Sequence, residues 1–227
     1  MAPSRISCIV PVFNGERYLQ EALESIFKQT YGPLEVIVVD DGSTDGTAAL
    51  AAGYGGRIRY LWQANAGEAA ARNRGLSAAQ GEFVAFLDAD DLWHPEKLAR
   101  QMARLRERPE IDLCFTSYQN FWTPELAEEA QRYQGHYLSQ PLSAYCICTL
   151  LTRRTVFTKF GDFATTNHPG GSANQVWFLR AAARGAVIEI WPEVLTYRRL
   201  HSANLSRTNT LEGFFPILRA WRDYQRR

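Results

Sequence analysis

The first 117 residues alternate short apolar runs with segments that carry apolar side chains at helical spacing. The apolar runs lie at 6–12, 35–39, 58–62, 83–87 and 111–117. Strands buried on both faces of a sheet have this continuous apolar character, and helices between them connect parallel neighbours. We therefore predict an α/β fold with a doubly wound, mostly parallel sheet flanked by helices.

The pattern is weaker after residue 117, where aromatic side chains are frequent up to residue 145. Three later segments have regular patterns, a helix at 175–184 and strands at 187–191 and 194–199. A terminal amphipathic pattern at 211–224 is expected to pack on the domain, and a helix on a membrane surface is the alternative. The prediction is one domain in two parts, residues 1–117 and a smaller extension over 118–227.

Charge and hydropathy exclude several classes of partner. The net charge of +1 gives no long-range attraction for nucleic acid. No apolar stretch reaches the ~18 residues that a membrane span needs, and the apolar run at 6–12 is too short for a signal peptide. We therefore predict a cytoplasmic protein with no nucleic-acid partner and no transmembrane segment, and leave peripheral contact with a membrane open.

The four cysteines lie in apolar surroundings at Cys8, Cys114, Cys146 and Cys148. A metal or redox site would require a Cys-x-x-Cys pair with further ligands, and no such pair occurs. On a strand, Cys146 and Cys148 would share one face. We predict buried, inert thiols.

Polar side chains follow the first, second and fourth predicted strands, as Asn14, Asp41, Asp88 and Asp90. Ligands of open α/β sheets bind beyond the carboxyl ends of the strands, which is where these residues fall. Asn14 is also placed to cap the helix that follows it. The convergence of these polar residues on one edge predicts a binding site there.

An acidic cluster, Asp88-Ala89-Asp90-Asp91, ends the fourth strand. Mutual repulsion of the carboxylates would be offset by a hard divalent cation that bridges carboxylate and phosphate oxygens. The alternative is a helix N-terminus made acidic to suit its dipole, since Pro95 begins a helix soon afterwards. Three acids exceed that need, so the sequence favours a metal.

The segment Asp40-Asp41-Gly42-Ser43 follows the second strand. A carboxylate there can accept a hydrogen bond from a nucleobase or a ribose hydroxyl, whereas the alternative is a turn built for its own geometry. The glycine-rich dinucleotide fingerprint is absent after the first strand, which argues against a nicotinamide enzyme.

Four motifs in order carry a family resemblance. They are Pro11-Val12-Phe13-Asn14-Gly15-Glu16, the run from Glu35 to Thr47 that contains Asp40-Asp41-Gly42-Ser43, Asn65-Ala66-Gly67 with Ala71-Arg72-Asn73-Arg74-Gly75, and Phe86-Leu87-Asp88-Ala89-Asp90-Asp91. In order and spacing they resemble the nucleotide-sugar half of family 2 glycosyltransferases. The resemblance is strong over residues 5–108 and weaker over 153–161 and 177–206.

The resemblance implies a GT-A fold and an inverting, metal-dependent transfer of sugar from a nucleoside-diphosphate-sugar, with a UDP-sugar favoured, to an acceptor hydroxyl. It implies a donor-binding half over 1–117, an acceptor-side half over 118–227, and a saccharide or lipid-linked acceptor. Expected donor-site residues are Pro11, Phe13, Asn14, Glu16, Asp41, Gly67, Arg72, Asp88 and Ala89. Expected ligands of Mn²⁺ or Mg²⁺ are Asp88, Asp90 and His201.

The sequence departs from the family on the acceptor side. The position at which the family supplies its catalytic base, an Asp, is Asn174 here, and an amide cannot act as a base near neutral pH. The acidic pair that the family often carries after Gly-x-Phe is also missing, because Gly161-Asp162-Phe163 is followed by Ala164-Thr165.

Several interpretations of Asn174 stay open. The chain is a nucleotide-sugar-binding pseudo-enzyme, or Asn174 has been introduced into an active sequence, or Asp162 or His168 supplies the base. A nucleotidyltransferase is disfavoured, since the basic, glycine-rich triphosphate loop expected after the first strand is absent. We favour a transferase.

Overall fold

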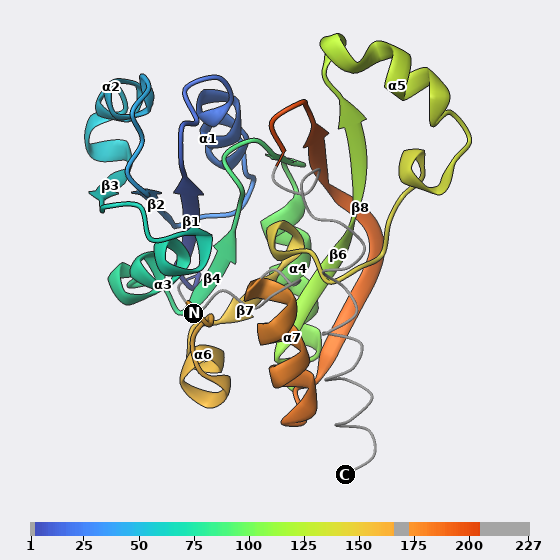
Figure 1. The fold of residues 1–227 in the computed structure, drawn as a ribbon. Coiled ribbons are helices and arrows are strands. Elements are labelled where there is room, and N and C mark those ends of the chain that lie inside the picture. Colours follow the sequence, from blue (N-terminus) through green and yellow to red (C-terminus); the bar gives the residue numbers. More distant parts are fainter. Residues whose placement is uncertain (1–2, 166–172, 205–227) are drawn as a thin grey trace.

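The computed structural model describes residues 3–165 and 173–204, which form an eight-stranded sheet with helices on both faces (Figure 1). The strand order is β3-β2-β1-β4-β7-β6-β8-β5. The strands are β1 (Ile6–Val12), β2 (Leu34–Asp40), β3 (Arg59–Trp62), β4 (Phe83–Phe86), β5 (Leu92–Trp93), β6 (Leu113–Trp122), β7 (Leu151–Arg153) and β8 (Ile188–Leu200). The helices are α1 (Leu19–Phe27), α2 (Thr47–Ala52), α3 (Glu68–Ala78), α4 (Lys97–Glu107), α5 (Ala127–Arg132), α6 (Thr155–Phe160) and α7 (Ala173–Ala183).

The predicted doubly wound, mostly parallel sheet is confirmed. Strands β3, β2, β1 and β4 pair in parallel, and so do β6 and β8. Strand β7 is antiparallel to both β4 and β6, and the short β5 is antiparallel to β8. Every residue of β1 and β4 is buried, which is the physical reason for their continuous apolar sequences.

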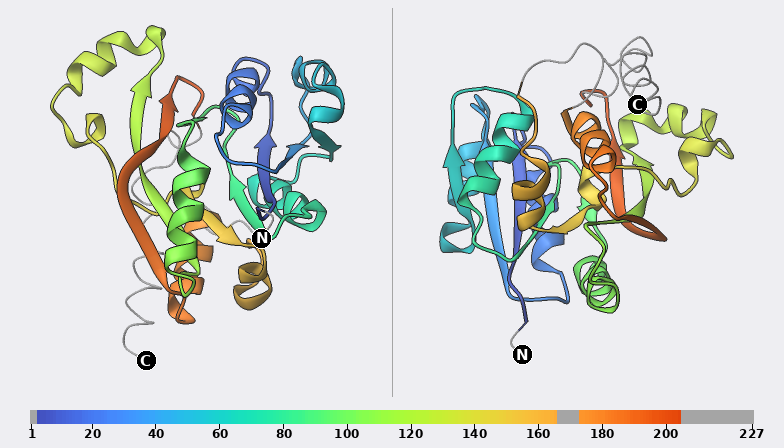
Figure 2. Two further views of the ribbon diagram at one scale, coloured as in Figure 1. Left: turned by 180° about the vertical axis from the view of Figure 1, so that it is seen from behind. Right: turned by 90° about the horizontal axis from the view of Figure 1, so that it is seen from below.

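Helices α3, α6 and α7 cover one face of the sheet, and α1 and α4 cover the other, as the right-hand view of Figure 2 shows. On the first face, aromatic side chains of α6 and α7 pack edge-on against the strands, as Phe157 on Phe86 and Phe178 on Phe115. On the other face, Gln101 of α4 donates to the carbonyls of Cys114 and Thr149. The placement of α3 and α7 on one face brings together residues that are far apart in the sequence.

Glycine is required at Gly75 by the close approach of α3 to the sheet. A Cβ atom on Gly75 would lie 2.4 Å from Cγ2 of Ile9 in β1. A methyl group at this position would therefore push the helix away from the strand. This accounts for a glycine inside an otherwise regular helix.

The sequence predictions were wrong in several details. The strands expected at 187–191 and 194–199 are the single strand β8, whose register against β6 shifts near Ser117. Helix α1 begins at Leu19 and Asn14 does not cap it, because Asn14 adopts φ 51° and its side chain bonds another loop. Cys146 and Cys148 lie at a 3₁₀ turn (Ile147–Thr149) and not on a strand.

Two predictions are not tested by the fold. The proposed division at residue 117 falls within β6, and the terminal helix at 211–224 lies outside the described residues. Among the described residues, none of the helices has the length and apolar character needed to cross a bilayer.

Lys97, at the start of α4, is a fully buried charge. Its ammonium group donates to Oε1 of Gln101 at 2.8 Å and lies 4.5 Å from the centre of the Trp93 ring. Burial lowers the pKa of Lys97 to about 8, because an apolar environment disfavours the charged form. The folded state therefore releases this proton at a lower pH than the unfolded state does.

We expect this group to make the protein more stable as pH rises above about 8. An unfolded chain keeps a lysine pKa near ~10.4, so at intermediate pH the unfolded state binds the proton more tightly and stability increases with pH. Between about pH 7 and about pH 9.5, the free energy of unfolding of the parent should rise by about 2 kcal/mol relative to that of Lys97→Met. Denaturant unfolding at both pH values measures this difference. An identical pH dependence in the two proteins would contradict the prediction.

Candidate functional site

The predicted donor-site residues gather beyond the carboxyl ends of β1, β2 and β4. Pro11 lies buried within β1, and Phe13 follows it with 54% of its surface exposed. Asp41 follows β2, and the Asp88–Asp91 turn follows β4, where the partly buried Ala89 packs against the core. The sheet topology therefore brings together the strand ends that the sequence singled out.

Two loops at this edge are tied together by side-chain hydrogen bonds. Oδ1 of Asn14 accepts from the Thr44 amide at 2.8 Å, and the Asn14 amide donates to Oγ of Ser43 at 2.8 Å. A carboxylate oxygen of Glu16 accepts from the Gly46 amide at 2.5 Å. Asn14 and Glu16 thus fix the loop after β1 against the loop after β2. The loop after β1 also carries the exposed ring of Phe13.

Asp41 organises the segment that leads into α3. Its side chain is 4% exposed, and its two oxygens accept from Nε2 of Gln63, the Ala66 amide and the Gly67 amide at 2.7, 2.9 and 2.8 Å. Gly67 has φ 88°, a conformation that favours glycine, and precedes the first turn of α3. The carboxylate therefore shapes the loop directly, at the positive end of the helix dipole.

Arg72 is a fully buried cation between three oxygen-bearing side chains. One terminal nitrogen of its guanidinium donates to Oδ1 of Asn174 at 2.9 Å and also contacts Glu68, and the other donates to Oδ1 of Asp88 at 2.5 Å. Nδ2 of Asn174 donates in turn to Glu68 at 3.0 Å. The guanidinium therefore joins α3, α7 and the strand end of β4 in one network.

Asp90 faces the segment that follows β8. Its Oδ2 is 3.0 Å from Nε2 of His201 and accepts from Nδ2 of Asn204 at 3.1 Å. The Asn204 side chain also accepts from the His201 amide at 2.6 Å, which holds this segment over the acidic turn. The structure therefore places His201 beside Asp90.

Asp91 and Arg199 connect the acidic turn to β8 and to α1. Oδ1 of Asp91 accepts from the Arg199 amide at 2.9 Å, and the Arg199 guanidinium donates to the Asp90 carbonyl and to Glu21. Burial, together with the nearby carboxylates of Asp90 and Asp88, raises the pKa of Asp91 well above its usual range. Any cation bound near these acids would relieve that repulsion.

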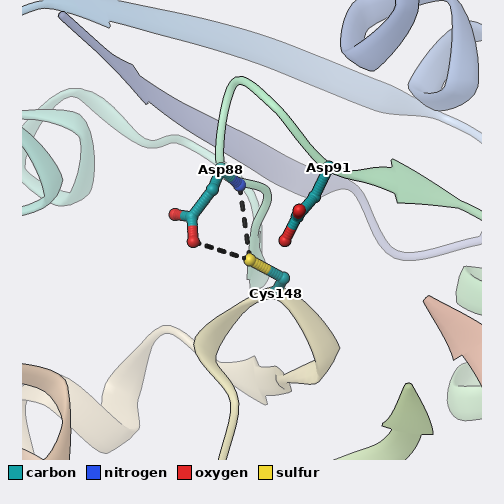
Figure 3. Close-up of side chains that lie close together, drawn as sticks. All are labelled: Asp88, Asp91 and Cys148. Carbon is teal, nitrogen blue, oxygen red and sulfur yellow. Dashed lines mark hydrogen bonds between the residues drawn. The ribbon is translucent and has the colours of Figure 1, made fainter. Parts of the chain in front are cut away.

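The donor groups at this turn suit a hard divalent cation. Asp88 and Asp90 keep 35% and 31% of their side chains exposed and offer carboxylate oxygens, and Asp90 lies beside the imidazole of His201. The ligand atoms that already lie within 4.8 Å of one another in the described part of the chain belong to a different set, Asp88, Asp91 and Cys148 (Figure 3). Among the described residues, the expected ligands Asp88, Asp90 and His201 do not form such a set. Asp90 turns toward His201, whereas the Asp88 carboxylate is held by Arg72 and Cys148.

Cys148 was missed by the sequence analysis. Its thiol donates to Oδ2 of Asp88 at 3.0 Å and accepts from the Asp88 amide at 3.4 Å, as Figure 3 shows. The prediction of a buried thiol is right, but the thiol positions a site carboxylate and is more than core filling. The spacing of Cys148 from the other cysteines does not indicate its contact with Asp88.

Of the alternative bases, Asp162 lies apart from the network around Arg72. It lines a surface pocket with Leu76 of α3 and with Arg154 and Thr158 from α6 and the residue before it. His168 lies outside the described residues. The sequence analysis did not consider Glu68, which the structure places beside Asn174.

Comparison with known proteins agrees with this geometry. Residues 7–183 match the family model described as glycosyl transferase family 2. The chain belongs to glycosyl transferase family 2. The matched segment contains the Asp41 loop, the Arg72 network and the Asp88–Asp91 turn of this family 2 chain.

Bacterial relatives share its sequence over different lengths. An uncharacterized glycosyltransferase of Rickettsia typhi is 33% identical over 92% of the family 2 chain and 69% of its own length. An uncharacterized glycosyltransferase of a Nostoc strain is 45% identical over 42% of the chain and 31% of its own length. The first of these matches spans most of both proteins.

Solved structures show the fold. TarS of Staphylococcus aureus, crystallised as residues 1–349 with UDP-GlcNAc, has a TM-score of 0.77 at 22% identity, over 97% of this chain and 66% of that chain. The mannosyltransferase PcManGT of Pyrobaculum calidifontis, solved with GDP-Man and Mn²⁺, has a TM-score of 0.69 at 23% identity, over 96% of this chain and 65% of that chain. The GT-A fold is therefore confirmed, and the family 2 chain spans about two-thirds of the length of these structures.

Proposed function

We propose that the protein transfers a sugar from a nucleoside-diphosphate-sugar to an acceptor hydroxyl with inversion at the anomeric carbon. The observation that carries the proposal is the convergence of Arg72, Asp88 and Asp90 at the end of β4, next to the end of β1 that the exposed Phe13 follows. An aromatic face suits a nucleobase, and the strand ends of an open α/β sheet are where nucleotides bind. TarS with UDP-GlcNAc and PcManGT with GDP-Man, both of the same fold, support a nucleotide-sugar donor.

In this proposal the donor side is built by residues 1–117 and the acceptor side by the remainder. Phe13 stacks on the base, while Asn14, Glu16 and Asp41 hold the base pocket in shape through the contacts described above. Pro11, Gly67 and Ala89 line the pocket, the partly exposed Asp88 meets the donor's ribose or sugar, and the buried Arg72 holds Asp88 in place from behind the pocket wall. The acceptor is a saccharide or a lipid-linked saccharide, and a lipid-linked one would place the reaction at a membrane surface.

Asp88, Asp90 and His201 would hold Mn²⁺ or Mg²⁺ in the working enzyme. Such an ion would stabilise the charge of the departing diphosphate. The chain's own residues then have two tasks, to hold the diphosphate end of the donor still and to remove the acceptor proton. Uridine is favoured as the base, and GDP-mannose is the donor to compare with it.

Calorimetric titration with UDP-GlcNAc and GDP-mannose, in Mn²⁺ and in chelator, tests the donor assignment. We expect Mn²⁺ to tighten binding, and Asp90→Asn to reduce the metal's effect by ~10–100-fold, because a ligand carboxylate is replaced by a neutral amide. Asp112→Asn is the matched control, since Asp112 pairs with Lys159 away from the site. Equal affinity in chelator and in Mn²⁺ would contradict the metal assignment.

A second candidate function is favoured by one observation, the amide at Asn174. If no carboxylate serves the acceptor, the chain binds nucleotide-sugar as a pseudo-enzyme without transferring it. Donor hydrolysis separates the two functions, because binding needs no base whereas turnover does. Binding without hydrolysis or transfer would favour the pseudo-enzyme.

A further inference from the structure

Asn174 and Glu68 are 106 residues apart in the sequence and in direct contact in the fold. Glu68 is the first residue of α3, and Asn174 lies in the first turn of α7. Both helices pack on the same face of the sheet, which brings the two side chains to one place (Figure 1). Residue 174 has no carboxylate, but the carboxylate of Glu68 is hydrogen-bonded to it.

The Asn174 amide bridges two charged groups of opposite sign. Its Oδ1 accepts from Arg72 at 2.9 Å, and its Nδ2 donates to Glu68 at 3.0 Å. An amide can accept from a guanidinium and donate to a carboxylate at the same time, whereas an ionised Asp at this position can only accept. An Asp at 174 would face the Glu68 carboxylate across the same distance, and two carboxylates so close cannot both ionise readily.

Charge balance around Arg72 leads to the same conclusion. The guanidinium already faces the carboxylates of Glu68 and Asp88, so one positive charge is shared by two negative charges. An Asp at 174 would add a third carboxylate to the same cation. Asn174 is thus the residue that fits a site in which Glu68 is ionised.

Among Arg72, Asn174 and Glu68, Glu68 has the side chain that is most open to a substrate. Its side chain is 42% exposed, whereas Arg72 is fully buried and Asn174 nearly so. Arg72 and Asn174 both bond the same oxygen, Oε1, so the carboxylate is held at a defined position. Its second oxygen, Oε2, takes part in neither of these bonds.

We propose that Glu68 is the catalytic base of this transferase, with Asn174 and Arg72 as positioning residues. The proposal rests on the transferase function proposed above. Glu68 takes the proton of the acceptor hydroxyl, and the acceptor oxygen forms a bond to the anomeric carbon. The bond from that carbon to the diphosphate breaks, and its electron pair leaves with the nucleoside diphosphate.

Moving the carboxylate between the two helices tests the proposal. Glu68→Gln should lower kcat for donor hydrolysis or transfer by ~10²–10⁴-fold, the usual cost of a missing base, with donor affinity close to that of the parent. Asn174→Asp alone should not raise kcat, because the two carboxylates would share a proton. The double variant Glu68→Gln/Asn174→Asp should recover at least about tenfold of the lost kcat, because a single ionised carboxylate returns to the same place.

The control is Glu107→Gln, an exposed glutamate at the end of α4, which should leave kcat and donor affinity unchanged. UDP-GlcNAc and GDP-mannose are the probes, with binding measured by calorimetry beside turnover. A Glu68→Gln protein with the parent's kcat, or a double variant no faster than Glu68→Gln, would overturn the base assignment. A parent that binds donor without turnover would overturn it while leaving donor binding intact, whereas a parent that neither binds nor turns over either donor would overturn the proposed function itself.

Discussion

Replacing Arg72 with methionine is expected to lower turnover by ~10²-fold or more and to destabilise the fold by about 3 kcal/mol. Arg72 is fully buried and bonds side chains from three parts of the chain, Glu68, Asp88 and Asn174. Without the cation, Glu68 and Asp88 repel each other, and the reacting groups that it holds lose their positions. The stability cost lies at the lower end of the range for a broken buried pair, because both carboxylates are partly exposed.

Urea unfolding and donor hydrolysis measure the two effects. Arg74→Met is the matched control, since Arg74 is an exposed arginine on the same helix. Arg72→Lys should recover little, because an ammonium group cannot reproduce the fork geometry of a guanidinium. An Arg72→Met protein with parental stability and turnover would show that the network does not organise the site.

Removing the carboxylate of Asp41 is the second substitution from which we expect a large effect, on both stability and nucleotide affinity. Asp41→Ala removes the buried carboxylate that accepts from the amides of Ala66 and Gly67 and from the Gln63 side chain, and a hydrogen bond to a charged group contributes about 1.5–3 kcal/mol. The free energy of unfolding should fall by about 3 kcal/mol. Nucleotide affinity should fall as well, with or without metal, because the loop before α3 loses its shape.

The graded comparison for this site is Asp41→Asn, which keeps one acceptor oxygen and should show an intermediate loss. Unfolding by urea and calorimetric titration with uridine diphosphate, in Mn²⁺ and in chelator, give the two readouts. A loss of affinity in Mn²⁺ alone would assign Asp41 to the metal and not to the nucleotide pocket.

Much of the fold was predictable because its signals are local. The apolar runs that became β1, β2 and β4 are continuous, since these strands are buried on both faces or nearly so. The acidic turn after β4 and the aspartate after β2 were recognisable because they directly follow such runs. The continuous course of β8 was not predictable, because Pro192 and Glu193 interrupt its apolar pattern and only pairing with β6 carries the strand past them.

The amino-acid sequence by itself determined the fold class, the buried strands β1, β2 and β4, and the acids that follow β2 and β4, because periodicity and motif spacing act over short stretches of chain. Only the tertiary structure decided what those acids face. The contact of Cys148 with Asp88, of His201 with Asp90 and of Asn174 with Glu68 each spans at least 60 residues. Such contacts depend on which helices share a face of the sheet and which loops share an edge. Side-chain packing across the whole domain sets these relations, and no local pattern in the sequence records them.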